Sequence, residues 1–280
     1  MIRAYYSLIK PGIVWSNAMT AAAGFFLAAS YPFDLLRFSA MLFGLALVIA
    51  GSCAANNVID RDIDARMERT KNRAVAANRI SPANAAAFAG VLGGLGFAIL
   101  FFLTNLLAFL AALFGAAVYL ALYTPLKRRT EHGTLIGAFS GSAPPVVGYA
   151  AAAHAIDGTA LVLFLILLSW QMIHFFAIAI FRIDEYRAAG IPVLPLTQDV
   201  SKTKRLMLAY LFLFWLSALA LFLIGSAGLI YAAVMTALSI GWLLLALKGF
   251  GAPDERGWAR RMFFYSLIVL LVFSATIAFY

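Results

Sequence analysis

Residues 159–181 read TALVLFLILLSWQMIHFFAIAIF, a run without any Lys, Arg, Asp or Glu. A helix that crosses the hydrocarbon core of a bilayer needs about 20 mostly apolar residues, and this segment is long and apolar enough to do so. The chain as a whole is 64% hydrophobic and only 12% charged. This composition predicts an all-α integral membrane protein.

Eight further segments have the same apolar character. The nine predicted spans lie near 12–30, 39–58, 84–103, 106–124, 136–153, 159–181, 206–224, 228–247 and 262–280. The longest gap between them is 59–83, which is too short for a separate soluble domain. We therefore expect one polytopic domain over 1–280 with nine transmembrane helices.

The basic residues predict how this bundle is oriented. With nine spans, 20 of the 21 Lys and Arg residues fall in loops on one side, and only Arg37 falls on the other. Cytoplasmic loops carry an excess of Lys and Arg, so the N-terminus is expected in the cytoplasm and the C-terminus outside. The net charge of +9 then reflects topology, and we do not expect nucleic-acid binding.

Five of the twelve acidic residues gather in two short patches at the ends of apolar spans, on the basic side. In the first patch, Asn56, Asp60 and Asp64 recur every four residues and would share one face of a continuous helix. Asp62 would project away from that face. Oxygen ligands at a membrane surface suit Mg²⁺, which takes one or two carboxylates together with substrate phosphate. These three residues are therefore predicted to form a catalytic metal site.

Cations follow these carboxylates within ten residues, namely Arg66, Arg69, Lys71 and Arg73. A site for metal alone would not gather so many cations, and a site for an anion alone would not include aspartates. Together they predict a metal-bound diphosphate, with Mg²⁺ between carboxylate and phosphate oxygens and Arg or Lys on the remaining oxygens. The alternative is a solvated loop that merely follows the positive-inside rule.

The second patch follows two polar residues inside a span, Gln171 and His174. Burying polar side chains in a membrane is costly, so both are candidates for function; for His174, an inter-helix hydrogen bond is the alternative. His174 and Glu185 are eleven positions apart, about three helical turns, and share a face if the helix continues. The predicted substrate-binding residues here are Gln171, His174, Arg182 and Tyr186, and the predicted additional metal ligands are Asp184 and Glu185.

Two further features lie in the middle of the chain. Tyr123 and Lys127 are four apart at the end of the fourth span and are predicted to contact substrate, although Tyr is common at membrane interfaces. The fifth span contains a run of small residues and a proline pair, GAFSGSAPPVVG over 137–148. It predicts either close helix packing or a wall that makes room for a bulky flat ligand.

Several of these motifs resemble those of a known superfamily. Asn56-x₃-Asp60-x₃-Asp64, Arg69-Thr70-x₂-Arg73 and Tyr123-x₃-Lys127 look like motifs of the UbiA-type intramembrane prenyltransferases. The similarity is closer to one branch, the protoheme IX farnesyltransferases (heme O synthases). The segments that carry it are Lys10-Pro11-Gly12, NNVIDRDIDARMERTKNR (56–73), GTLIGAFSGSAPPV (133–146), Trp170-Gln-Met-x-His174 and YRAAGIPVLP (186–195).

The resemblance implies nine transmembrane helices around a central cavity and transfer of a farnesyl group from farnesyl diphosphate to a vinyl group of heme B, giving heme O. Carried over, Asn56, Asp60 and Asp64 would hold Mg²⁺, and the residues on the diphosphate would be Arg69, Lys71, Arg73 and Lys127. The chain departs from the superfamily in its second acidic motif. Many members have two aspartates four apart there, whereas Asp184 and Glu185 are adjacent, which leaves the number of Mg²⁺ ions open.

The resemblance also implies a location and partners. We expect a bacterial cytoplasmic (inner) membrane protein whose active site faces the cytoplasm, with heme A synthase or a terminal oxidase as candidate protein partners. Two alternatives are a UbiA-type enzyme that prenylates a quinone precursor or another aromatic acceptor, and a secondary transporter. Transport sites tend to lie near the bilayer midplane, whereas the acids here gather on one side, which disfavours the transporter.

Overall fold

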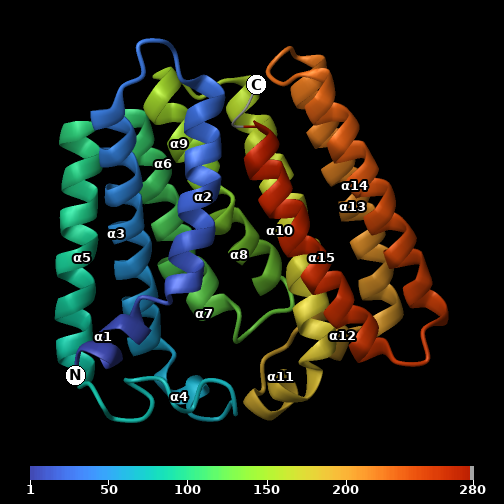
Figure 1. Cartoon of the computed structure of the whole chain (residues 1–280). Helices are drawn as coiled ribbons and strands as arrows, with labels where there is room; N and C mark the ends of the chain where they lie inside the picture. Colours follow the sequence, from blue (N-terminus) through green and yellow to red (C-terminus); the bar gives the residue numbers. More distant parts are fainter. Residues whose placement is uncertain (278–280) are drawn as a thin grey trace.

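The computed structural model describes residues 1–277, almost entirely as helices (Figure 1). Seven stretches in this described part are long and apolar enough to cross a membrane. They are α3 (Leu35–Ile59), α5 (Pro82–Leu103), Leu106–Leu126 with α6 (Leu106–Ala117), η1 (Val118–Tyr123) and α7 (Thr124–Leu126), α10 (Gly158–Phe181), α13 (Val200–Leu223), Leu229–Gly251 with α14 (Leu229–Leu247) and η2 (Lys248–Gly251), and α15 (Glu255–Ile277).

Two of the nine predicted spans are not among these seven. The first corresponds to α2 (Pro11–Ala28), which has 18 residues and carries the polar Ser16, Asn17 and Thr20. The fifth corresponds to two helices, α8 (Gly133–Gly141) and α9 (Ala143–Ala153), separated at Ser142. The count of nine therefore remains a prediction. The last three residues of the predicted span 262–280 lie outside the described residues.

The remaining helices are short and lie at one end of the bundle (Figure 1). They are α1 (Ile2–Leu8), α4 (Arg61–Asp64), α11 (Ile183–Ala189) and α12 (Leu194–Thr197). The same end holds both acidic patches, while the C-terminal end of α15 lies at the opposite end from α1. The polar residues that the sequence singled out are thus concentrated at one end of an apolar bundle.

Polar caps define where the long helices begin. The side chains of Asp34, Ser81, Asn105, Asp157 and Asp199 each accept a hydrogen bond from a backbone N–H in the first turn of the helix that follows. Such caps satisfy N–H groups that lack a partner within the helix. They fix the N-terminal starts of α3, α5, α6, α10 and α13.

Small residues bring the helices close together. A methyl group added at Gly148 of α9 would overlap the carbonyl oxygen of Ala21 in α2, and one added at Gly24 of α2 would overlap the carbonyl oxygen of Pro145. In α3, Gly51 packs in the same way on the backbone of α5. Small residues are enriched where membrane helices pack, because they let the backbones approach. The close-packing interpretation of the fifth span therefore applies to α9.

Proline interrupts the helices that line the centre of the molecule. Pro144 and Pro145 lack N–H donors and cannot continue a helix begun at Gly133 without a break, which accounts for the separation at Ser142. In the preceding helix, Pro125 lies in α7, directly after the π-helical segment η1. Thr124, the first residue of α7, donates through its hydroxyl to the carbonyl of Tyr119 at 2.8 Å. π-Helical turns are rare and frequently occur at functional sites.

Candidate active site

A cavity of about 940 Å³ lies inside the bundle. Its lining comes from the helices α2, α3, α6, α8, α9, α10 and α15, from η1, and from the short helices α4 and α11 and the loops at the polar end of the bundle, which carries the acidic patches. This volume is at the upper end of the roughly 300–1,000 Å³ range of ligand pockets. Charged residues line the polar end. The rest of the wall is largely apolar and aromatic, with Trp170, Phe175 and Phe263 among its members. The cavity can therefore hold a ligand that has an anionic group and a large apolar part.

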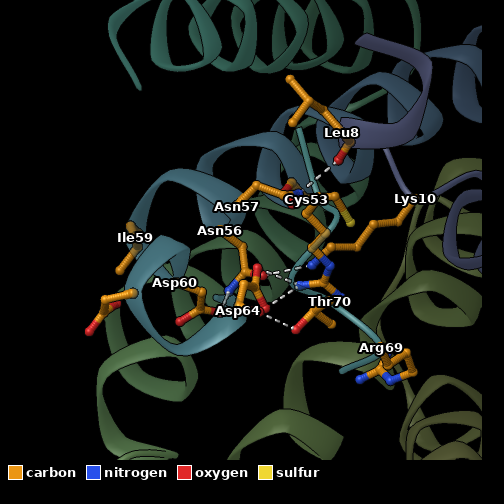
Figure 2. Close-up of polar contacts among 12 residues, drawn as sticks. Leu8, Lys10, Cys53, Asn56, Asn57, Ile59, Asp60, Asp64, Arg69 and Thr70 are labelled. Atoms are coloured by element: carbon orange, nitrogen blue, oxygen red, sulfur yellow. Dashed lines mark hydrogen bonds and ion pairs between the residues drawn. The ribbon is translucent and has the colours of Figure 1, made fainter. Parts of the chain in front are cut away.

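The first acidic patch lies at the joint between α3 and α4 (Figure 2). The helix is not continuous there, because α3 ends at Ile59 and α4 begins at Arg61. Backbone hydrogen bonds from Asp60 to Asn56 (2.9 Å) and from Asp64 to Asp60 (2.8 Å) nevertheless keep the four-residue spacing. All three side chains are buried and line the cavity. Asn56 Nδ2 donates to Asp60 Oδ2 at 2.7 Å.

Each of the two aspartates is paired with cations. Lys127 Nζ donates to Asp60 Oδ2, and Arg128 is 3.2 Å from Asp60 Oδ1. Arg73 Nη1 donates to both oxygens of Asp64, at 2.8 and 2.7 Å. Buried charges are tolerated when they are paired in this way. A metal-bound diphosphate would fit the same set, because the carboxylates could turn to the metal and the cations to phosphate oxygens.

Lys10 is a site residue whose only mark in the sequence is the Lys10-Pro11-Gly12 motif. It adopts a left-handed conformation (φ 50°) between α1 and α2, and its Nζ donates to Asn56 Oδ1 at 2.7 Å. Burial is the main cause that lowers the pKa of Lys10 to about 8. The signal in the sequence was a lysine directly before Pro11-Gly12, at the start of an apolar span and on its basic side.

The second acidic patch is placed differently from the sequence expectation. α10 ends at Phe181, and Arg182 (φ −111°) separates it from α11. The helix therefore does not continue from His174 to Glu185, which was the condition for the two residues to share a face. Both residues still line the cavity. Glu185 Oε1 accepts a hydrogen bond from Arg182 at 2.5 Å. Its Oε2 is buried without a hydrogen-bond partner in the described chain, 3.7 Å from Nε of Arg69.

Two predicted ligands do not reach the cavity. Asp184 is exposed and forms ion pairs with Arg187 (2.7 Å) and Arg256 (2.5 Å). Lys71 forms an ion pair with Glu68 at 2.7 Å, and neither Lys71 nor Asp184 is among the cavity-lining residues. Neighbouring residues of a helix point in different directions, so only one residue of the adjacent Asp-Glu pair can face the cavity from α11.

Three tyrosines lie on the wall beside the charged residues. Tyr123 stacks on Tyr119 with ring centroids 5.5 Å apart, and Nζ of Lys127 lies 5.1 Å from the centroid of the Tyr123 ring. Tyr186 lies on α11, and burial is the main cause that raises the pKa of its hydroxyl to about 12. A neutral phenol can donate a hydrogen bond to an anion. Tyr119 was missed because no motif marks it.

The two polar residues of α10 also line the cavity. Gln171 is buried and packs against Gly141, where an added methyl group would overlap its side chain. Its Nε2 lies 3.5 Å from the hydroxyl of Ser142. His174 Nδ1 is 2.7 Å from the hydroxyl of Ser266 in α15. The inter-helix hydrogen bond considered for His174 therefore exists, and the same ring lines the cavity.

The donor set of the polar end fits Mg²⁺ only in combination with a substrate. No group of three His, Cys, Asp or Glu side chains suited to a metal occurs within residues 1–277. The protein oxygens available are those of Asn56, Asp60 and Asp64, together with Oε2 of Glu185 on the cavity wall, which has no hydrogen-bond partner in the described chain. Mg²⁺ is usually held by one or two carboxylates plus substrate phosphates and water. These residues fit that arrangement and not an all-protein cage.

The comparison with protein families decides the relationship of this chain. The model of the "UbiA prenyltransferase family" matches residues 17–268. This chain belongs to the UbiA prenyltransferase family. Most of the cavity-lining residues described above lie within the matched segment, and Lys10 precedes it.

Proteins similar in sequence match this UbiA-family chain over almost its full length. The protoheme IX farnesyltransferase of Marinomonas sp. (strain MWYL1) is 46% identical over 281 residues, covering 99% of this chain and 95% of that protein. The protoheme IX farnesyltransferase of Sodalis glossinidius (strain morsitans) is 45% identical, covering 96% and 92%.

Solved structures share the UbiA fold. A digeranylgeranylglyceryl phosphate synthase superposes with a TM-score of 0.82 at 17% identity and covers 100% of this chain and 99% of its own. A UbiA homologue from Archaeoglobus fulgidus bound to DMAPP and Mg²⁺ superposes with a TM-score of 0.78 at 16% identity, covering 98% of this chain and 97% of its own. These similarities establish the fold of this UbiA-family chain.

Proposed function

We propose that this protein transfers the farnesyl group of farnesyl diphosphate to a vinyl group of heme B and produces heme O. The observation that carries the proposal is the identity of 43–46% over nearly the full length with proteins named protoheme IX farnesyltransferase. The cavity supports it, because its charged end suits a diphosphate and its aromatic remainder suits a large flat acceptor and an isoprenoid tail.

At the polar end, we assign Asn56, Asp60 and Asp64 to a Mg²⁺ ion and place Glu185 beside them as a further ligand. The metal would neutralise charge that develops on the departing diphosphate. Arg69, Arg73 and Lys127 are assigned to the remaining phosphate oxygens, with Arg182 and the hydroxyls of Tyr123 and Tyr186 as further donors. Charge-assisted hydrogen bonds to an oxyanion are stronger than neutral ones. The exposed Lys71 and Asp184 have no place in this arrangement.

The proposed reaction breaks the bond between the farnesyl C1 and the diphosphate oxygen, and the electron pair leaves with the diphosphate. The terminal carbon of a heme vinyl group then bonds to C1, and the positive charge passes to the carbon next to the porphyrin ring. Water adds there and loses a proton, which leaves a hydroxyl group. An allylic cation reacts readily with water, so an apolar chamber that limits water protects it.

The membrane topology belongs to the same proposal. We infer a single intramembrane domain with nine crossings, in which α2 and the α8–α9 pair add to the seven apolar stretches. The end that carries α4 and α11 would face the cytoplasm, because nearly all Lys and Arg residues lie on that side. We propose a bacterial inner membrane as the location. Heme A synthase or a terminal oxidase, which would accept the product, are the proposed protein partners.

Product analysis with purified protein tests the proposed activity. The protein in lipid nanodiscs is incubated with heme B, farnesyl diphosphate and Mg²⁺, and the porphyrins are examined by mass spectrometry. We expect heme O, no product in the presence of EDTA, and recovery when Mg²⁺ is added in excess. A parallel reaction replaces heme B by a quinone precursor. Prenylation of that acceptor without conversion of heme B would contradict the proposal and favour the aromatic-acceptor alternative.

A further inference from the structure

The imidazole of His174 is held between two helices inside the cavity wall. Its ring stacks on Trp170 of the same helix, with centroids 4.8 Å apart and an interplanar angle of 18°. Phe263 of α15 lies on the ring at 4.9 Å. Trp170 Nε1 donates to the backbone carbonyl of Ser266 at 2.8 Å. These contacts fix the plane of the His174 ring and tie α10 to α15 at the level of Ser266.

A chain of hydrogen bonds determines which nitrogen of His174 carries the proton. The hydroxyl of Ser266 lies 2.6 Å from the carbonyl oxygen of Phe263 and 2.7 Å from His174 Nδ1. A carbonyl oxygen only accepts, so the single hydroxyl proton of Ser266 is donated to Phe263. The Ser266 oxygen then accepts from His174, and Nδ1 must be the donor. The neutral ring is therefore protonated on Nδ1.

The other ring nitrogen is left with a lone pair and no protein partner. No residue in the described part of the chain hydrogen-bonds to His174 Nε2, and the side chain lines the cavity and is not fully buried. A neutral imidazole whose Nδ1–H is held by a protein oxygen is the form in which histidine binds metals through Nε2. This arrangement suits a metal centre carried by the ligand in the cavity.

We propose that Ser266 is a positioning residue that holds His174 as the Nδ1–H tautomer, so that Nε2 binds the iron of the heme acceptor. The inference rests on the proposed function, because it takes heme B as the acceptor. Iron ligation would anchor the porphyrin at α10 and α15 and thereby restrict which part of its edge can meet the farnesyl C1. Ser266 acts through His174 and does not itself touch the substrate.

Binding measurements with two porphyrins test the iron contact. The full-length protein in nanodiscs is titrated with ferric heme B and, separately, with iron-free protoporphyrin IX. The wild type should bind heme B more tightly and shift its Soret band. His174→Ala should abolish both the preference and the shift. Ser266→Ala should reduce the preference by roughly 10- to 100-fold, the range for the loss of a hydrogen-bond partner of a metal-bound histidine. Ser266→Thr, which keeps the hydroxyl, should restore much of it.

Ser274 provides the matched control on the same helix. It is buried, and its hydroxyl has no hydrogen-bond partner in the described chain, so Ser274→Ala should keep the wild-type preference for heme B. An equal preference in Ser266→Ala and the wild type would overturn the role of Ser266. An unchanged Soret band in His174→Ala would overturn iron ligation. If the wild type still forms heme O, either of these two results would overturn only the role of His174 or Ser266 and would leave the proposed function intact. If the wild type forms no heme O, the proposed function itself would be wrong.

The tautomer can also be observed without any variant of Ser266. The chain contains only three histidines, so ¹⁵N-histidine labelling gives a spectrum that can be assigned with His174→Ala. We expect His174 in the ligand-free protein to show a protonated Nδ1 and an unprotonated Nε2. Protonation on Nε2 would overturn the proposal even if Ser266→Ala failed to fold.

Discussion

At the scale of single residues, Asp60 and Asp62 show how two neighbouring carboxylates can differ in chemistry. The side chain of Asp60 is 3% exposed and lies on the cavity wall, whereas that of Asp62 is 53% exposed and contacts Arg128. A buried carboxylate beside a cavity can take part in binding a metal-bound substrate. An exposed ion pair contributes little, because water screens it.

Substitution of the three aspartates tests this difference. Asp60→Ala and Asp64→Ala should each reduce heme O formation by about a thousandfold or more, since loss of a metal bridge to the leaving group costs several kcal/mol. Asp62→Ala should retain most of the activity. The measurement is turnover of purified protein, with thermal unfolding in detergent to confirm folding. Asp60→Asn, which keeps the size of the side chain but not its charge, controls for lost packing and should be as inactive as Asp60→Ala. Equal losses in all three variants would contradict the assignment.

The cations on the cavity wall lead to a second test. Arg73→Ala should raise the apparent KM for farnesyl diphosphate by roughly 10- to 150-fold, because a charge-assisted hydrogen bond contributes about 1.5–3 kcal/mol. The KM for heme B should change much less. Arg66→Ala is the control, since Arg66 is exposed and does not line the cavity. A larger effect on heme B than on farnesyl diphosphate would assign Arg73 to the porphyrin carboxylates.

At the scale of helices, close packing of α2 on α9 positions one wall of the cavity. Gly148 leaves no space for a side chain, because an added methyl group would overlap the backbone of α2. α2 contributes Asn17 to the cavity, Lys10 lies directly before α2, and α9 contributes Ala143 and Pro144. Separation of these helices would therefore disturb the site from two sides.

Two glycine substitutions test the role of this contact. Gly148→Ala should destabilise the protein by about 1–3 kcal/mol, the usual cost of overpacking. Gly94→Ala on α5 should be neutral or stabilising, because an added methyl group there meets open space and alanine has a higher helix propensity than glycine. Thermal unfolding in the same detergent measures both. If the Gly148→Ala protein is as stable to thermal unfolding as the wild type, close contact between α2 and α9 does not contribute to stability, and this prediction is wrong.

At the scale of the whole molecule, the charged loops and the charged end of the cavity lie at the same end of the bundle (Figure 1). Farnesyl diphosphate is charged at one end only, so this arrangement would admit its diphosphate from one aqueous side while the isoprenoid chain stays in the apolar part. With the proposed nine crossings, the positive-inside rule predicts that this side faces the cytoplasm.

Thiol labelling tests this orientation. In a Cys53→Ala background, which removes the single cysteine, Ser30→Cys and Arg66→Cys each introduce one exposed thiol at opposite ends of the bundle. A membrane-impermeant maleimide should label Ser30→Cys in intact spheroplasts and Arg66→Cys only after permeabilisation. The reverse pattern would place the cavity mouth outside the cell.

Some features could be predicted because they depend on residues close together in the chain. Apolar runs predicted the seven long membrane stretches, and the four-residue spacing predicted that Asn56, Asp60 and Asp64 share one face. The proline pair indicated an unusual fifth span. The break at Ser142 was not predicted, because hydropathy does not report where a helix ends inside an apolar segment. The predicted span 159–181 agrees with α10, but the sequence left open whether the helix continues to Glu185.

The sequence by itself therefore determined the membrane class, the family and the residues of the acidic patches, since length, periodicity and motifs are local properties. Only the tertiary structure decided which side chains meet. Lys10 contacts Asn56, 46 positions away, and His174 contacts Ser266, 92 positions away. The tertiary structure also decided that Asp184 is exposed and pairs with Arg256, while Glu185 faces the cavity. Partners this distant are fixed by how the helices pack, and no spacing along one helix contains that information.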